Sequence, residues 1–148
     1  MNALLHNPPV LGIAAWSGTG KTTLLTKLLP LLRAQGLRVG MLKHAHHAFD
    51  INPVDGDVSL WDMLAHLDRG KLDLILVEGF KHERFPKLEL HRAAVGKPLL
   101  FPDDDAIIAI ASDTPVDTAL SRLDINDPEA VAAFIVDYCN NDIDPTGL

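Results

Sequence analysis

Residues 10 to 22 read VLGIAAWSGTGKT, and this stretch decides the fold. Its apolar part, residues 10–15, predicts a buried strand. Residues 17–22 then match the last six positions of the phosphate-loop pattern G-x-x-x-x-G-K-[ST], and Ala15 stands at the position of its first glycine. The replacement is tolerated if the backbone at Ala15 keeps an ordinary conformation. The alternative, a plain strand-to-helix connection, is disfavoured because the match lies where a phosphate loop has to lie.

The chemistry of this loop assigns roles to its residues. Backbone amides at the start of the helix point toward an anion, and Gly18 and Gly20 allow the turn that aims them. Lys21 supplies positive charge to the outer phosphates, and the hydroxyl of Thr22 is placed to bind Mg²⁺. The residues expected to bind the nucleotide here are Ser17, Gly18, Thr19, Gly20, Lys21, Thr22 and Thr23.

The remainder of the chain alternates between strand and helix patterns. This order predicts an α/β protein with a three-layer P-loop NTPase fold, a mostly parallel central sheet and a single domain over residues 1–148. Pro30 predicts a kink or a tightened last turn in the first helix, and Gly36 predicts its left-handed end. The segment 87–91 alternates in polarity and is expected nearer the sheet edge. The predicted strands are 10–15, 37–42, 72–77, 87–91 and 106–111; the predicted helices are 21–35, 59–68 with Ser59 as N-cap, and one capped by Asp127.

Composition and charge limit the classes of function. The chain of 148 residues carries a formal net charge of −7, which disfavours a nucleic-acid surface because such surfaces cluster Lys and Arg. Its apolar runs are far shorter than the roughly 20 residues that span a bilayer, and no signal peptide is apparent. Cys139 is the single cysteine, so no intramolecular disulfide can form. These features predict a cytoplasmic protein that binds neither membrane nor nucleic acid.

Polar residues at the carboxyl ends of the predicted strands are further candidates, because ligands of parallel sheets bind there. Glu78 follows strand 72–77 and is expected to face Mg²⁺ and the attacking water, as the catalytic and metal-binding carboxylate. Asp113 follows strand 106–111 and can accept hydrogen bonds from the ring N–H and amino group of guanine, which favours GTP. The alternatives are a solvated strand end for Glu78 and a turn aspartate for Asp113. Asp73, at the opposite end of its strand, is expected to be structural.

A basic cluster ends the second predicted strand. Lys43 is expected to face the nucleotide or a bound substrate. His44, His46 and His47 follow it and form either an anion-facing group with Lys43 or a transition-metal site. Their spacing differs from that of structural zinc sites, and the lone cysteine cannot complete one. A second polar group follows Gly79. It is expected either to lie at the mouth of the same ligand site or to form a solvated loop, and it comprises Lys81, His82, Glu83 and Arg84.

Three strings of residues together resemble one family: AAWSGTGKTTL from Ala14, KHAHH from Lys43 and LDLILVEGFKHE from Leu72. They are similar to the molybdopterin-guanine dinucleotide biosynthesis adaptor proteins, the MobB family. The strings IASD from Ile110 and LDIND from Leu123 extend the likeness over nearly the whole chain. The resemblance implies a protein that binds GTP and Mg²⁺ and has at most weak GTPase activity. It also implies a homodimer that assists a molybdenum cofactor guanylyltransferase, the enzyme that joins GMP to molybdopterin, with molybdopterin itself as a further expected ligand.

The chain departs from the family pattern in one place. Family members carry a longer stretch after the aspartate that matches Asp50, whereas here Asn52 and Pro53 meet Val54 almost at once. We therefore expect one domain with a shortened or missing insertion near residues 50–58.

Two other classes stay open from the residues alone. A P-loop small-molecule kinase needs a substrate lid, and of the few arginines only Arg84 and Arg92 are expected near the mouth. A metal-delivery GTPase is suggested by the histidine cluster after Lys43.

Overall fold

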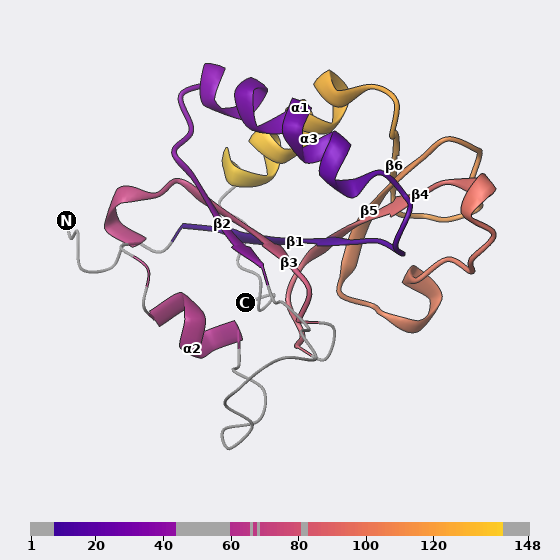
Figure 1. Cartoon of the computed structure of the whole chain (residues 1–148), viewed down its shortest axis with the longest axis horizontal. Helices are drawn as coiled ribbons and strands as arrows, with labels where there is room; N and C mark the ends of the chain where they lie inside the picture. The colour runs from indigo at the N-terminus through magenta and orange to yellow at the C-terminus, as the bar shows by residue number, and fades with distance from the viewer. Residues whose placement is uncertain (1–7, 44–59, 66, 68, 81–82, 141–148) are drawn as a thin grey trace.

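The computed structural model describes residues 8–43, 60–65, 67, 69–80 and 83–140. Its centre is a six-stranded sheet in the order β2-β3-β1-β4-β5-β6, in which every neighbouring pair of strands is parallel (Figure 1). The predicted parallel α/β architecture is confirmed. The strands are β1 (Val10–Ala14), β2 (Val39–Lys43), β3 (Leu74–Glu78), β4 (Lys87–His91), β5 (Ile107–Ser112) and β6 (Ser121–Asp124).

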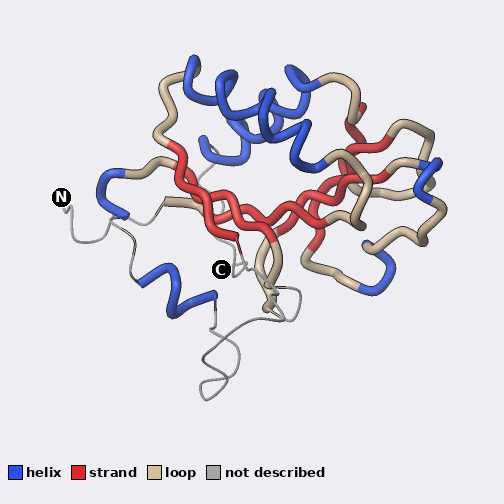
Figure 2. The backbone as a smooth tube through the Cα atoms, viewed as in Figure 1, coloured by secondary structure: helices blue, strands red, loops and turns tan. Residues whose placement is uncertain are grey.

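Helices lie on both faces of the sheet and complete the three layers (Figure 2). Helices α1 (Lys21–Ala34) and α3 (Pro128–Asn140) pack together on one face, and α2 (Leu60–Ala65) lies on the other (Figure 1). The larger apolar core fills the space between α1, α3 and the sheet, and a smaller one lies beneath α2. Burial of these apolar side chains is the main stabilising term of the fold. Fully buried members of the larger core include Leu11, Leu28, Leu32, Leu76, Leu90 and Ile135.

The end of α1 accommodates its internal proline as predicted. Pro30 lies inside the helix, and the N–H of Gln35 donates to both Leu31 O, at 3.3 Å, and Leu32 O, at 3.1 Å. This sharing marks a tightened last turn. Gly36 follows with a φ of 89°, the left-handed conformation that ends helices.

The start of α3 also follows the sequence signals. The Asp127 carboxylate accepts a hydrogen bond from the N–H of Ala130 at 3.0 Å, as an N-cap residue does. Pro128 occupies the first helical position, where its missing N–H costs nothing. The hydroxyl of Tyr138 donates to Val10 O at 2.8 Å and ties α3 to the sheet.

The expectation that residues 87–91 lie near the sheet edge is wrong, because β4 lies between β1 and β5. Leu88 and Leu90 belong to the core under α1 and α3. Lys87 and Glu89 point to the other face, yet both are buried, with 5% and 0% of their surface exposed. The alternation of apolar and charged residues in β4 therefore reflects two sheet faces that are both buried. Charged side chains can be buried on the second face because they are paired and hydrogen-bonded there.

The connection from β4 to β5, residues 92–106, covers that second face in place of a long helix. It contains two short 3₁₀ turns, Ala93–Val95 and Phe101–Asp103. The Glu89 carboxylate holds it, accepting hydrogen bonds from Leu100 N at 2.7 Å and Phe101 N at 2.9 Å. Both N–H groups thus find a partner inside the protein.

Replacing Glu89 by glutamine is expected to change how stability depends on pH. Burial raises the pKa of the Glu89 carboxyl, and the two backbone N–H groups lower it only in part. The folded state therefore keeps this proton to a higher pH than the unfolded state, so the free energy of unfolding falls as pH rises from 4.5 to the raised pKa. Glutamine does not titrate. We expect the free energy of unfolding of the wild type, relative to Glu89→Gln, to decline through this window by at most about 1.4 kcal/mol per pH unit.

Urea unfolding of both proteins between acid and neutral pH measures this difference. Glu129→Gln, an exposed change in the first turn of α3, is the matched control. A difference that rises with pH would contradict the assignment.

Some element boundaries differ from those predicted. Strand β2 begins at Val39, because Leu37 N still donates to Leu32 O in the turn that ends α1. Helix α2 ends at Ala65, before a 3₁₀ turn at Arg69–Lys71. The expected cap Ser59 lies outside the described residues. Strand β6 was not predicted, since it is a short edge strand with mainly exposed residues.

Asp73 is structural, as expected. Its carboxylate accepts hydrogen bonds from Arg38 N at 2.7 Å and Arg38 Nε at 3.0 Å. In the described part of the chain, no helix is long and apolar enough to cross a membrane.

Candidate functional site

The phosphate loop lies between β1 and α1, at the carboxyl end of a central strand. Gly18 and Gly20 have φ values of 88° and 92°, a conformation that glycine adopts at no steric cost. Ala15 has an ordinary φ, since Phe80 is the single non-glycine residue with a positive φ among those described. The condition for replacing the first glycine of the motif is therefore met.

Thr19 contributes to the shape of the loop. Its side chain is buried, and its hydroxyl donates to Trp16 O at 2.7 Å. Its N–H donates to the same oxygen at 3.2 Å, which closes a tight turn. The loop is thus held open in a curved form by its own hydrogen bonds. Ser17, Gly18, Thr22 and Thr23 are exposed and accessible to a ligand.

Lys21 and Glu78 meet at the mouth of this loop. Lys21 Nζ lies 3.4 Å from Glu78 Oε1, and the Glu78 side chain is 10% exposed. Lys43 ends β2 directly beside Glu78, because the two residues are register partners of parallel strands. The ends of three elements thus bring a carboxylate and two ammonium-bearing residues into one region. Such a group suits phosphates and a divalent cation.

The chain turns sharply after Glu78. Gly79 has a φ of 92° and Phe80 a φ of 57°, so two successive residues are left-handed. For Phe80 this conformation costs about 1–2 kcal/mol. Its side chain is buried in the smaller core, which offsets the cost. Strained backbone of this kind concentrates at functional sites.

Asp113 approaches the phosphate loop through Arg92. The Asp113 Oδ1 atom accepts the N–H of Ala93 at 3.0 Å, and Oδ2 lies 4.0 Å from Arg92 Nη1. Arg92 Nε in turn donates to Thr19 O at 2.9 Å. The Asp113 carboxylate therefore has partners in the protein, and Arg92 links it to the phosphate loop. Both oxygens retain the capacity for a second hydrogen bond.

A second link between the phosphate loop and the 92–106 connection runs through Trp16. Its indole N–H donates to Pro98 O at 2.8 Å, and Lys97 Nζ lies 5.5 Å from the centre of its ring. A cation at this distance from an aromatic face is weakly attracted to it. The connection therefore braces the phosphate loop at two points.

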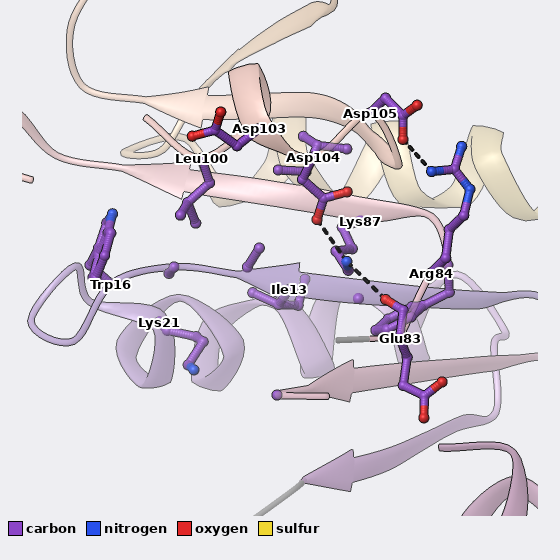
Figure 3. Close-up of a pocket in the computed structure, with 16 residues that line it drawn as sticks. Ile13, Trp16, Lys21, Glu83, Arg84, Lys87, Leu100, Asp103, Asp104 and Asp105 are labelled. Carbon is purple, nitrogen blue, oxygen red and sulfur yellow. Dashed lines mark hydrogen bonds and ion pairs between the residues drawn. The ribbon is translucent and has the colours of Figure 1, made fainter. Parts of the chain in front are cut away.

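A cavity of about 500 Å³ opens beside the phosphate loop, on the sheet face opposite α1 and α3 (Figure 3). Lys21 and Trp16 line one end of it, and Lys87 and Asp104 face each other within it. Its volume lies within the range of small-molecule sites. Arg84, expected at the mouth of the site, lines the cavity and forms an exposed ion pair with Asp105.

Sequence reasoning missed part of this region. Arg92, expected near the mouth of the site, lies there after β4, but its hydrogen bond to Thr19 O had no sequence signal. The hydrogen bond from Trp16 to Pro98 O and the cavity also had no sequence signal. His44, His46, His47, Lys81 and His82 lie outside the described residues.

The geometry fits a nucleoside triphosphate with a bound Mg²⁺. Two left-handed glycines curve the backbone ahead of a long helix whose N-terminus favours anions. Thr22 and Glu78 offer a hydroxyl and a carboxylate, the oxygen ligands that Mg²⁺ prefers.

Comparisons of the sequence with known proteins all find proteins of molybdopterin guanine dinucleotide synthesis. The family model for molybdopterin guanine dinucleotide synthesis protein B matches residues 10–59 and 51–113. The molybdopterin-guanine dinucleotide biosynthesis adapter protein of Escherichia coli is 40% identical over 162 residues, covering 88% of this chain and 93% of that protein. The adapter protein of the same name from Haemophilus influenzae is 36% identical and covers 90% of each chain.

Solved structures agree with the fold. The crystal structure of a MobB homologue from Bacillus stearothermophilus superposes with a TM-score of 0.68 at 25% identity, covering 89% of this chain and 98% of that one. A crystal structure of a molybdopterin-guanine biosynthesis protein B gives a TM-score of 0.67 at 24% identity, covering 87% and 99% of the two chains.

Proposed function

Because the chain belongs to the molybdopterin guanine dinucleotide synthesis protein B family, we propose that it is a GTP-binding adaptor that assists the attachment of GMP to molybdopterin. The observation that carries the proposal is the phosphate loop: its two left-handed glycines precede α1, and Lys21 lies 3.4 Å from Glu78 at its mouth. Family membership supports a role in the synthesis of the guanine dinucleotide cofactor, and the geometry of the loop supports binding of nucleotide phosphates.

Each residue of the site has a role in this proposal. The backbone from Ser17 to Thr23 and the Lys21 ammonium hold the phosphates. Thr22 and Glu78 hold Mg²⁺, which would neutralise phosphate charge and support slow hydrolysis at most. Glu78 also orients water, and Lys43 adds charge at the end of β2. Asp113 accepts hydrogen bonds from the ring N–H and the amino group of guanine. Its two carboxylate oxygens can do so because Ala93 and Arg92 do not use all of their acceptor positions.

The partners follow from the adaptor role. We infer that the chain acts in the cytoplasm as a homodimer, together with a molybdenum cofactor guanylyltransferase, and that molybdopterin is a further ligand. We also infer a single domain with a shortened insertion near residues 50–58. The alignment with the Escherichia coli protein spans 162 residues, more than the 148 of this chain, which supports that inference.

A competition titration tests the nucleotide proposal. GTP, ATP and GDP compete against a fluorescent guanine nucleotide bound to the purified chain, with and without Mg²⁺. We expect micromolar GTP binding that strengthens with Mg²⁺, and weaker ATP binding. Tight ATP binding with indifference to GTP would remove the proposal, and rapid phosphoryl transfer to a metabolite would favour a small-molecule kinase instead.

Replacing Glu78 by glutamine is expected to separate metal binding from phosphate binding. The change removes a negative charge that pairs with Lys21, so GTP binding without Mg²⁺ should be unchanged or stronger. With Mg²⁺ the affinity should fall about tenfold, since one anionic ligand is lost. Titration of GTP in EDTA and in Mg²⁺ measures both effects. Equal losses under both conditions would show that Glu78 supports the loop and not the metal.

A further inference from the structure

The cavity beside the phosphate loop contains a charge pair, a buried lysine and a half-buried aspartate, with unused hydrogen-bonding capacity. Lys87 Nζ lies 2.7 Å from Asp104 Oδ2 and donates to Glu83 O at 3.2 Å. The Lys87 side chain is 6% exposed and that of Asp104 is 30% exposed. Lys87 and Asp104 both line the cavity and face each other in it (Figure 3).

The count of donors and acceptors defines the ligand that would complete this pair. An ammonium group has three N–H donors, and in the described part of the chain two of those of Lys87 have acceptors. Each carboxylate oxygen accepts two hydrogen bonds, and Asp104 uses one at Oδ1, from Ala106 N at 3.0 Å, and one at Oδ2, from Lys87. Lys87 Nζ also lies 4.9 Å from the centre of the Phe85 ring, a weaker contact than a hydrogen bond. One N–H donor without a hydrogen-bond acceptor and two acceptor positions therefore remain beside one another.

This pattern is complementary to one planar group. A 2-amino-4-oxopyrimidine edge presents an amino group and a ring N–H as two donors, next to a carbonyl oxygen as acceptor. We propose that the cavity binds a ligand through this edge, which pterins and guanine share. In the bound state Asp104 accepts from the amino group and the ring N–H, and Lys87 donates to the carbonyl oxygen.

The remaining walls suit a flat ring. Gly12 of β1 has no side chain, and the Phe85 ring lies directly over it. Ile107 and Leu100 add apolar surface on the β5 side. Apolar walls around a few polar groups are the usual make-up of a small-molecule site.

The open end of the cavity reaches Lys21 at the phosphate loop. A ligand with an anionic group beyond its ring would place that group toward Lys21, next to the nucleotide phosphates. This arrangement rests on the proposed function, in which a pterin and a guanine nucleotide meet. The occupant that the geometry favours is a pterin that carries an anionic substituent, because the Asp113 site leaves the cavity free while GTP is bound.

Fluorescence titration with 6-carboxypterin tests the inference on the full chain. We expect saturable binding, at least about tenfold weaker binding of the 2,4-dioxo analogue 6-carboxylumazine, and at least about tenfold weaker pterin binding by Lys87→Met. Methionine fills the buried position without an ammonium group, and the partly exposed Asp104 can be hydrated. GTP affinity should change by less than about twofold in the variant.

Two further variants keep the test decisive. Arg38→Met breaks an exposed ion pair with Asp73 away from the cavity and should leave pterin binding unchanged. Ala14→Leu adds bulk to the cavity wall without touching the charge pair, so it should weaken pterin binding even if Lys87→Met fails to fold. Circular dichroism checks the fold of each variant.

The outcomes separate the sources of the shared chemistry. Guanosine that displaces the pterin, where adenosine does not, supports recognition of the shared edge and makes guanine a second occupant. Equal binding of pterin and lumazine, or no effect of both Lys87→Met and Ala14→Leu, overturns the inference. Absence of pterin and guanosine binding at about 1 mM, with GTP binding intact, overturns it and leaves the proposed function standing. Absence of GTP binding by the wild-type protein would instead overturn the proposed function.

Discussion

Replacing Lys21 by methionine is expected to weaken GTP binding by about 100-fold. The ammonium group makes charge-assisted hydrogen bonds with the outer phosphates, each of which contributes about 1.5–3 kcal/mol. Its loss also leaves the buried Glu78 carboxylate without its partner at 3.4 Å, which adds repulsion toward the phosphates. Isothermal titration calorimetry with GTP, in the presence of Mg²⁺, measures the effect.

The matched control is Lys27→Met. Lys27 is exposed on the same helix, α1, and lies more than a turn beyond the phosphate loop. It should retain wild-type affinity within about twofold. If both variants lose affinity equally, general charge and not the phosphate loop accounts for nucleotide binding.

Replacing Gly12 by alanine is expected to destabilise the protein by about 1–3 kcal/mol. A Cβ atom at this position would lie 2.4 Å from Phe85 Cε2 and 3.0 Å from Lys87 Cγ. Phe85 is 4% exposed and packs in the smaller core, so relieving this contact moves its ring out of its packed position. Thermal unfolding should show a fall in Tm of about 2–4 °C for each kcal/mol.

Gly40→Ala in β2 provides the comparison. There the added Cβ would meet Leu72 Cδ1 at 2.7 Å, the far end of a flexible and half-buried side chain. Both changes gain similarly from a less flexible unfolded chain, so their difference isolates the contact with the ring. Equal Tm values for the two variants would contradict the close packing of Phe85 over β1.

The sequence by itself determined the α/β class, the phosphate loop and most of the strands. These predictions succeeded because each depends on local chemistry: the apolar run of β1, the positive-φ glycines at 18 and 20, and the cap at Asp127. Glu78 could be placed for a similar reason, since a residue that follows a buried parallel strand lies at the ligand edge of the sheet.

The tertiary structure alone decided the position of β4 and what surrounds it. Lys87 and Glu89 resemble the solvated face of an edge strand until Asp104, Leu100 and Phe101, 11 to 17 residues away, supply partners for their charges. The braces from Arg92 to Thr19 and from Trp16 to Pro98 join segments 73 and 82 residues apart. Whether a charged residue is exposed or buried depends on which distant segment covers it, and the local pattern of residues carries no record of that segment.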